Sequence, residues 1–193
     1  CRDKKGNFCP KTFSEKATKK QVKMIEIKLS QGAKPGHGGM LLAPKVTEEI
    51  ALTRGIETGK DCISPSKHKE FSSPSELLKF VSKLRKLSHG KPVGIKMCVG
   101  HPWELISIIK AMVVEKKYID FITVDGAEGG TGAAPAEFTD HIGCPLKDAL
   151  VFVDNALVGS NLRDKVKIGA SGKIISAFDI AHMCALGADW INM

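Results

Sequence analysis

The order of apolar and polar residues predicts that strands and helices alternate along the chain. Short apolar runs rich in β-branched residues are typical of buried strands, and longer segments with apolar residues three or four positions apart are typical of helices. Residues 1–21 are polar, and we expect them to be irregular. Strands are expected at about 23–29, 93–98, 119–124, 166–169 and 189–193, and helices at about 47–53, 74–87, 102–113, 145–158 and 176–186.

At least four strand–helix repeats predict an α/β fold with a parallel sheet. The candidate functional residues follow strands, which would place them on the C-terminal rim of a (β/α)8 TIM barrel. An open doubly wound sheet obeys a similar rule, but glycine-rich loops after the later strands favour the barrel. A complete barrel needs about 250 residues, and about five strands are evident here. We therefore predict a partial barrel, roughly its C-terminal half to two thirds, in one domain over residues 1–193 that is incomplete at both ends.

The segment after the 119–124 strand is rich in glycine. Its glycines, four within seven residues, are Gly126, Gly129, Gly130 and Gly132. Glycine is needed where φ is positive or where a neighbour comes too close for a Cβ, and a strand, a glycine loop and a helix together can wrap a phosphate or a flat cofactor. Asp125 and Glu128 indicate that the loop also contacts a ring or a polar ligand edge. The alternative is an ordinary tight turn, which needs one or two glycines.

Several basic residues are candidates for anion binding. Lys96 lies in a buried strand, where its charge is costly unless it meets a partner; the alternative is a snorkelling lysine. Lys34 lies in a second glycine-rich loop and is suited to the same role. Arg54 ends a helix, where it suits either a bidentate contact with a carboxylate or a plain C-terminal position. Ser171 and Gly172 lie between a strand and a helix and are candidates for a phosphate loop.

The composition excludes several classes of function. The net charge is +8, but the lysines are mixed with Asp and Glu, and no nucleic-acid motif accompanies them. No apolar run approaches the ~20 residues of a membrane helix. The six cysteines lack metal-site spacing, so we expect no metal ligands and a reducing, cytoplasmic compartment. Cys98 and Cys184 are expected to be buried free thiols.

Five motifs together resemble the FMN-binding domain of glutamate synthase, and most of all the stand-alone FMN-binding glutamate synthase family proteins. The motifs are residues 31–39, 63–65, 125–135, 162–164 and 187–189. The resemblance implies a (β/α)8 barrel that holds FMN, an oxidoreductase acting on CH–NH2 donors, and reduction of 2-iminoglutarate, formed from 2-oxoglutarate and ammonia, to L-glutamate. Electrons arrive in that family through an iron–sulfur cluster, whose cysteines are not in this chain. The electron donor is left open.

The resemblance also implies roles for individual residues. Lys34 and Lys96 are the expected catalytic residues, and Lys34, Arg54 and Ser64 are expected to bind a small-molecule substrate such as 2-oxoglutarate. The expected cofactor-binding residues are Gln31, Lys96, Asp125, Gly126, Gly129, Gly130, Thr131, Ser171 and Gly172. A lysine near the pyrimidine end of a flavin stabilises the anionic reduced ring electrostatically.

Two positions depart from the pattern of glutamate synthase. Met40 stands where that enzyme has a substrate-contacting glutamine, and His37 where it has a glutamate. Three alternatives therefore stay open: a flavin-binding relay or interaction module without glutamate synthase turnover, an FMN oxidoreductase with a different substrate, and a barrel that binds a phosphorylated sugar without flavin.

Overall fold

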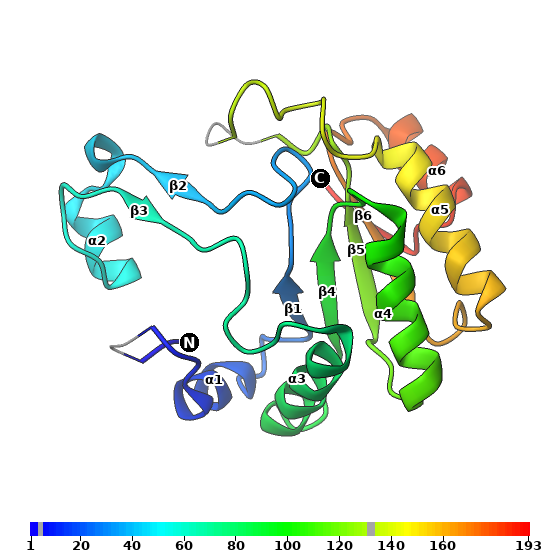
Figure 1. The fold of residues 1–193 in the computed structure, drawn as a ribbon, viewed down its shortest axis with the longest axis horizontal. Helices are drawn as coiled ribbons and strands as arrows, with labels where there is room; N and C mark the ends of the chain where they lie inside the picture. Colours follow the sequence, from blue (N-terminus) through cyan, green and yellow to red (C-terminus); the bar gives the residue numbers. More distant parts are fainter. Residues whose placement is uncertain (4–5, 131–133) are drawn as a thin grey trace.

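In the computed structural model, which describes residues 1–3, 6–130 and 134–193, strands and helices alternate along most of the chain (Figure 1). The strands are β1 (Ile25–Lys28), β2 (Met40–Leu41), β3 (Cys62–Ile63), β4 (Val93–Met97), β5 (Phe121–Asp125), β6 (Lys167–Ser171) and β7 (Trp190–Asn192). The helices are α1 (Pro10–Ala17), α2 (Glu48–Arg54), α3 (Pro74–Leu87), α4 (Pro102–Glu115), α5 (Leu146–Gly159) and α6 (Ala177–Ala185), with a 3-10 turn, η1 (Ala43–Lys45).

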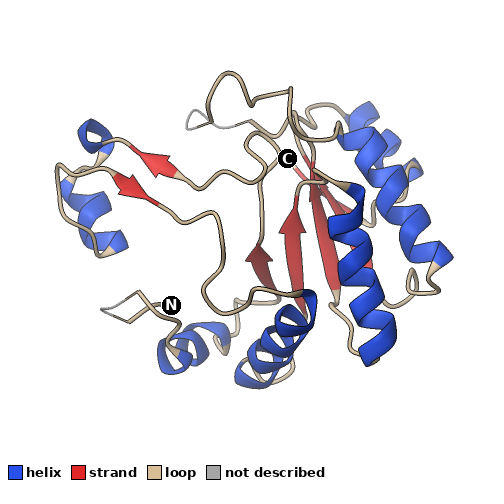
Figure 2. Cartoon of the chain, viewed as in Figure 1, coloured by secondary structure: helices blue, strands red, loops and turns tan. Residues whose placement is uncertain are grey.

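Five strands form one parallel sheet in the order β1-β4-β5-β6-β7. Each strand therefore lies beside the next sheet strand in the sequence, and helices α3, α4 and α5 lie on one face of the sheet (Figure 2). A doubly wound sheet reverses its strand order and carries helices on both faces. In a barrel the strands follow one another in sequence order, and all the helices lie on the outer face. The predicted α/β fold with a parallel sheet is confirmed, and its strand order is that of a barrel.

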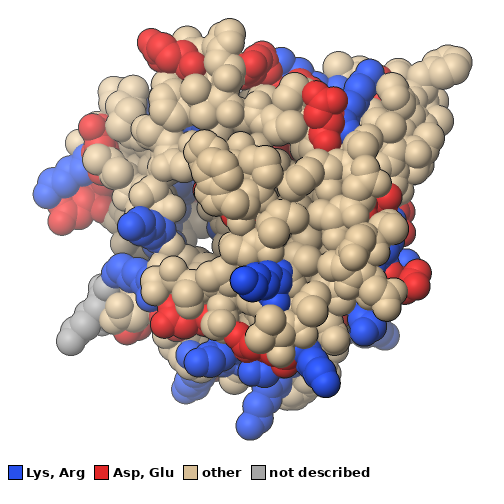
Figure 3. Space-filling view, turned by 45° about the vertical axis from the view of Figure 1, so that its right-hand side comes forward, with Lys and Arg blue, Asp and Glu red and all other residues tan. Residues whose placement is uncertain are grey.

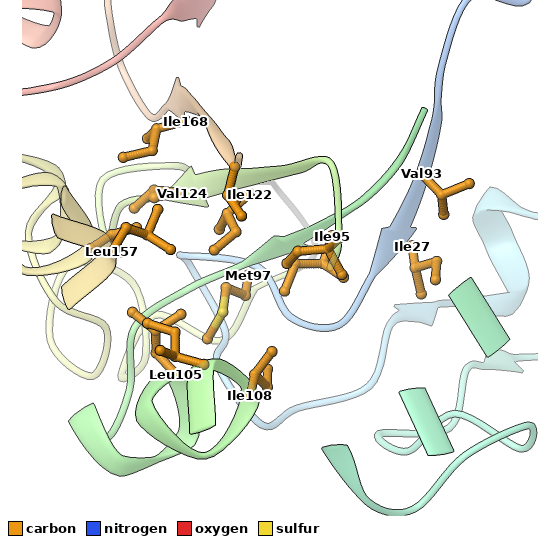
Figure 4. Packing of buried hydrophobic residues seen from close by; sticks show 14 of the residues in the cluster. Ile27, Val93, Ile95, Met97, Leu105, Ile108, Ile122, Val124, Leu157 and Ile168 are labelled. Atoms are coloured by element: carbon orange, nitrogen blue, oxygen red, sulfur yellow. The ribbon is translucent and has the colours of Figure 1, made fainter. Parts of the chain in front are cut away.

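The two faces of the sheet differ in chemistry because side chains alternate along each strand. Ile27, Ile95, Ile122 and Ile168 point to the helices and join Leu105 and Leu157 in the apolar core (Figure 4). Burying one such side chain contributes roughly 1.5–3 kcal/mol. The residues between them, which lie on the opposite face, are Glu26, Lys28, Lys96, Thr123, Asp125 and Ser171. The alternation therefore gathers the polar groups on the face that would line a barrel.

Two aromatic rings occupy the lower part of that polar face, near the N-terminal ends of the strands. Phe121 and Trp190 meet edge to face, with ring centroids 5.4 Å apart. A Cβ on Gly94 would lie 2.4 Å from the Phe121 ring, and one on Gly169 would lie 2.5 Å from the Trp190 ring. Glycine at these two strand positions therefore makes room for the aromatic side chains.

The prediction that residues 1–21 are irregular was wrong, because Pro10–Ala17 form helix α1. Pro10 occupies a favourable first-turn position, and Phe13 and Ala17, four residues apart, are buried. The hydroxyl of Ser14 donates to the carbonyl of Leu87 at the end of α3. The helix therefore depends on tertiary contacts that its polar composition does not reveal.

Residues 37–66 leave the sheet as an arm that carries β2, η1, α2 and β3 (Figure 1). Met40 pairs with Ile63, and Leu41 with Cys62, in a short antiparallel ladder. Helix α2 is capped by the Thr47 hydroxyl and ends at Gly55, whose φ of 66° is left-handed. The helix is close to its predicted position, and the pairing of β2 with β3 is a further finding.

On the face shown in Figure 3, most basic side chains lie toward the lower half, with acidic side chains among them. Across the described parts of the chain, every helix is too short or too polar to cross a membrane. Cys98 is buried as predicted, but Cys184 is exposed. Met183 is the buried residue of α6, and the next residue in a helix points about 100° away from it.

Candidate functional site

Three predicted site residues meet at the C-terminal ends of neighbouring strands. The ammonium of Lys96, in β4, lies 3.2 Å from Oδ1 of Asp125, the last residue of β5. It also lies 3.4 Å from the hydroxyl of Ser171, the last residue of β6. The Asp125 side chain is only 3% exposed. Parallel registry brings these groups together, because the strands end at the same edge of the sheet.

The carboxylate of Asp125 also fixes a second loop. Its Oδ2 accepts the backbone N–H of Gly32 at 2.8 Å, while the backbone N–H of Gly126 donates to the carbonyl of Ser171 at 2.9 Å. A buried carboxylate needs such partners, because an unpaired buried charge is strongly unfavourable. Asp125 therefore joins β4, β5 and the loop that follows β1.

The glycine-rich loops pack against one another. A Cβ on Gly32 would lie 1.6 Å from the carbonyl oxygen of Gly126, so only glycine fits there. Gly172 has a φ of +137°, and a Cβ on it would lie 3.4 Å from the backbone nitrogens of Gly126 and Gly129. The close neighbours of these glycines are other parts of the protein. The loops therefore form one interlocked rim above the sheet.

A further lysine joins the site from β1. Lys28 is paired in register with Lys96, and its ammonium donates to Oε1 of Gln31 at 2.8 Å. Burial lowers the pKa of Lys28 below its ordinary value, and the positive charge of Lys96 lowers it further. Lys34 is 6% exposed and adds to the same positive field. We call Lys28, Lys96, Asp125 and Ser171 the rim cluster; its surplus of positive charge suits an anionic ligand.

Sequence reasoning missed Lys28 and its neighbours on the polar face. Glu26 accepts a hydrogen bond from the buried hydroxyl of Thr123 at 2.6 Å. The signal was present in the alternation of Ile25, Glu26, Ile27 and Lys28, which places the two charged residues on one face.

Glu128, in the glycine loop, has a partner within the protein. Its carboxylate accepts the backbone N–H of Leu146 at the start of α5, at 3.0 and 3.2 Å from its two oxygens. That the loop also contacts a ring or a polar ligand edge stays a prediction. A carboxylate at this position satisfies a helix N–H that has no partner within the helix.

Two predicted substrate ligands lie elsewhere. Arg54 is exposed in the last turn of α2, in the arm that stands apart from the sheet (Figure 1). Ser64 follows β3, where its N–H donates to the carbonyl of Gly39 at 2.7 Å. The structure does not bring either residue to the rim cluster. Gly129 and Gly130 lie in the loop after β5, and Thr131 lies outside the described residues.

A hollow of about 1260 Å³ lies beside β1. Residues of β1, of the segment 64–74, and of helices α3 and α4 line it. It reaches Lys28, Ser30 and Ser64, but Lys96, Asp125 and Ser171 are not among its lining residues. The rim cluster is therefore marked as the candidate site by its chemistry and by the converging loops.

A singly wound parallel α/β sheet with a cationic rim defines a barrel-type protein suited to an anionic ligand. A family model described as the conserved region in glutamate synthase matches residues 14–193. The chain therefore belongs to the glutamate synthase family.

Curated relatives agree with this family. The glutamate synthase large subunit-like protein YerD of Bacillus subtilis is 45% identical over 192 residues, which cover 100% of this chain and 36% of that protein. An archaeal glutamate synthase [NADPH] of Methanocaldococcus jannaschii is 42% identical over 166 residues, which cover 86% of this chain and 32% of that protein. The chain thus spans about a third of the length of these relatives.

Solved structures with a similar fold include two of flavocytochrome b2. The A198G:L230A form with sulfite bound has a TM-score of 0.52 at 16% identity, and covers 94% of this chain and 37% of that one. The A198G:L230A form with pyruvate bound has a TM-score of 0.51 at 15% identity, and the match covers 90% of this chain and 36% of that one. At this identity the likeness concerns the fold alone.

Proposed function

We propose that this chain forms the FMN-binding part of an oxidoreductase of glutamate synthase type, acting on CH–NH2 donors. The reaction is the reduction of 2-iminoglutarate, formed from 2-oxoglutarate and ammonia, to L-glutamate. The observation that carries the proposal is the convergence of Lys96, Asp125 and Ser171 with the glycine loops at one rim. Membership of the family, over residues 14–193, supports the reaction type.

The donor groups present fit a flavin. Its ring system has carbonyl and ring-nitrogen acceptors and becomes anionic on reduction, which matches the ammonium of Lys96, the hydroxyl of Ser171 and the amide of Gln31. Gly172 lies in the loop between β6 and α6, where a phosphate would contact backbone N–H groups. The proposed cofactor ligands are Gln31, Lys96, Asp125, Gly126, Gly129, Gly130, Thr131, Ser171 and Gly172.

Bound FMN would supply the two-electron transfer, and the protein would supply charge and position. Lys96 would stabilise negative charge on the ligand, and Asp125 would hold Lys96 at its place in the rim. Lys34, buried beside Lys28, is the stronger candidate for a substrate carboxylate. Arg54 and Ser64 are weaker candidates because both are exposed and lie away from the rim cluster.

A second candidate function is a flavin-binding relay or interaction module, or a flavin oxidoreductase with another substrate. The observation that favours it is the chemistry of two loop residues. Met40 is 42% exposed on β2, and the Nδ1 atom of His37 lies 2.6 Å from the carbonyl of its neighbour Gly38. Neither residue offers the amide or the carboxylate that the resemblance places there.

The full-length protein tests both candidates. Its absorption spectrum should show bound flavin after purification or after reconstitution with FMN. Turnover of 2-oxoglutarate and ammonia with a chemical reductant should then yield L-glutamate. Bound FMN without glutamate would favour the second candidate, and a protein that binds no FMN would contradict both. An iron–sulfur cluster in the full-length protein and a cytoplasmic location remain parts of the proposal.

A further inference from the structure

Glu128 joins the glycine loop to a helix. Its two carboxylate oxygens lie 3.0 and 3.2 Å from the backbone nitrogen of Leu146, the first residue of α5. Pro145, at the N-cap position, has no side-chain oxygen that could cap the helix. A carboxylate from the loop therefore accepts the free N–H at the N-terminus of α5. A helix N-terminus is a favourable place for a negative charge.

The same contact holds the loop backbone from one side. A Cβ on Gly126 would lie 2.4 Å from Oε2 of Glu128 and 2.5 Å from Cβ of Leu146. The carboxylate and the first residue of the helix therefore both pack closely against Gly126. The backbone N–H of Ala127 donates to the carbonyl of Cys144 at 2.9 Å, just before α5. The loop is therefore attached to the start of α5 at two successive residues, by the backbone of Ala127 and by the side chain of Glu128.

The same loop carries the glycines proposed to contact the cofactor. Gly129 donates its N–H to the carbonyl of Gly126 at 2.8 Å, which closes a tight turn. The backbone nitrogens of Gly126 and Gly129 face Gly172, and the carbonyl of Gly126 faces Gly32. A shift of the loop at Glu128 would thus move all the glycines that form the rim.

We propose that Glu128 is a positioning residue, which sets the place of the Gly126–Gly129 backbone against the bound cofactor by anchoring it to α5. The inference rests on the proposed binding of FMN. Glu128 acts through the loop and does not touch the ligand. Both of its features matter: the oxygen that accepts the Leu146 N–H, and the negative charge at the helix N-terminus.

The test compares Glu128→Ala and Glu128→Gln in the full-length protein. Glutamine keeps an acceptor oxygen and loses the charge, whereas alanine loses both. We expect Glu128→Ala to weaken FMN binding on the order of tenfold, as when an outer partner of a metal ligand is removed, and to change the visible circular dichroism of bound FMN. Glu128→Gln should change both less. Amide hydrogen exchange of residues 126–130, measured without flavin, should be faster in Glu128→Ala.

Glu76 provides the matched control. Its carboxylate also lies at a helix N-terminus, where it accepts the N–H and the hydroxyl of Ser72 before α3. Glu76→Ala should lower the melting temperature but leave FMN affinity, the flavin circular dichroism and exchange at 126–130 unchanged.

The outcomes separate this inference from the proposed function. Unchanged exchange at 126–130 in Glu128→Ala would overturn the anchor whether or not flavin binds. Unchanged FMN affinity and circular dichroism alongside a lower melting temperature would also overturn it, because Glu128 would then be a helix cap alone. If the wild type binds no FMN, the proposed function and the role toward the cofactor both fail, and faster exchange would then support only the anchor.

Discussion

The backbone nitrogen of Gly32 donates a hydrogen bond to Oδ2 of Asp125 at 2.8 Å, across 93 positions of sequence. The other oxygen of the same carboxylate lies 3.2 Å from the ammonium of Lys96. One buried acidic side chain thus holds a loop backbone and a catalytic candidate at the same time. A change at either partner should therefore be felt at the other, and the first two predictions concern these partners.

Replacing Lys96 with Met should lower the reduction potential of bound FMN while FMN stays bound. Methionine keeps most of the stem and removes the charge, so the reduced anionic ring would lose an opposing cation. A partly buried charge contact is worth about 1 to 3 kcal/mol, or roughly 20 to 60 mV for a two-electron couple. A spectroscopic redox titration of the full-length protein measures it. Lys110→Met, at an exposed position of α4, is the control, and an unchanged potential in Lys96→Met would place that lysine away from the flavin.

Replacing Gly32 with Ala should destabilise the protein by about 2 to 3 kcal/mol, as is common for overpacking. The added methyl would lie 1.6 Å from the Gly126 carbonyl, so one of the two loops must move. The same substitution at Gly159 in α5 meets open space and should be neutral or stabilising by up to about 1 kcal/mol. Denaturant unfolding of the full-length variants compares them, and equal stabilities would contradict the backbone contact.

Stability should depend on Asp189 at acid pH. Burial acts to raise the pKa of Asp189, but hydrogen bonds from the Ile168 N–H and the Arg163 guanidinium bring it below its ordinary value of 3.8. A lowered folded-state pKa contributes stability that is present above pH 3.8 and lost as the pH falls through the lower folded value.

Asp189→Asn should therefore cost roughly 1 kcal/mol at pH 7, a small figure because the side chain is partly exposed, and it should flatten the loss of stability below pH 4. Melting temperatures between pH 2 and 7, with Asp164→Asn at an exposed position as control, measure this. An unchanged acid limb would contradict the assignment.

The cysteines should differ strongly in reactivity. Burial raises the pKa of the Cys98 thiol to about 11, whereas Cys1 and Cys184 are exposed. The thiolate is the reactive form, so at pH 8 ionisation alone should slow Cys98 by about two orders of magnitude against an ordinary thiol. Iodoacetamide labelling of the native full-length protein, mapped by mass spectrometry, checks this. Labelling in urea is the control, and early modification of native Cys98 would show that the β4 end is open.

The parallel strands could be predicted because their signal is local. Runs such as Val93–Met97 combine β-branched residues with flanking turn residues, and the structure places β4 within one residue of the prediction. The meeting of Lys96, Asp125 and Ser171 could also be predicted, because parallel strands of one sheet end at a common edge. These inferences need only the order of the elements.

The rest depends on contacts between distant residues. Helix α1 is stabilised by packing of Phe13 and Ala17, and the β2–β3 ladder is a pairing across the arm. The direction of Glu128 was missed because its partner, the Leu146 N–H, lies 18 positions later. In each case the residues can be read from the sequence, but the distant residue that packs against them, pairs with them or accepts their hydrogen bond cannot.

The aromatic pair of Phe121 and Trp190 gives the polar face a direction. The two rings fill the space that Gly94 and Gly169 leave, so the N-terminal end of this face is obstructed while the rim cluster lies at the other end. In the proposed barrel, a ligand would therefore approach Lys96 from the side of the glycine loops rather than past the two aromatic rings.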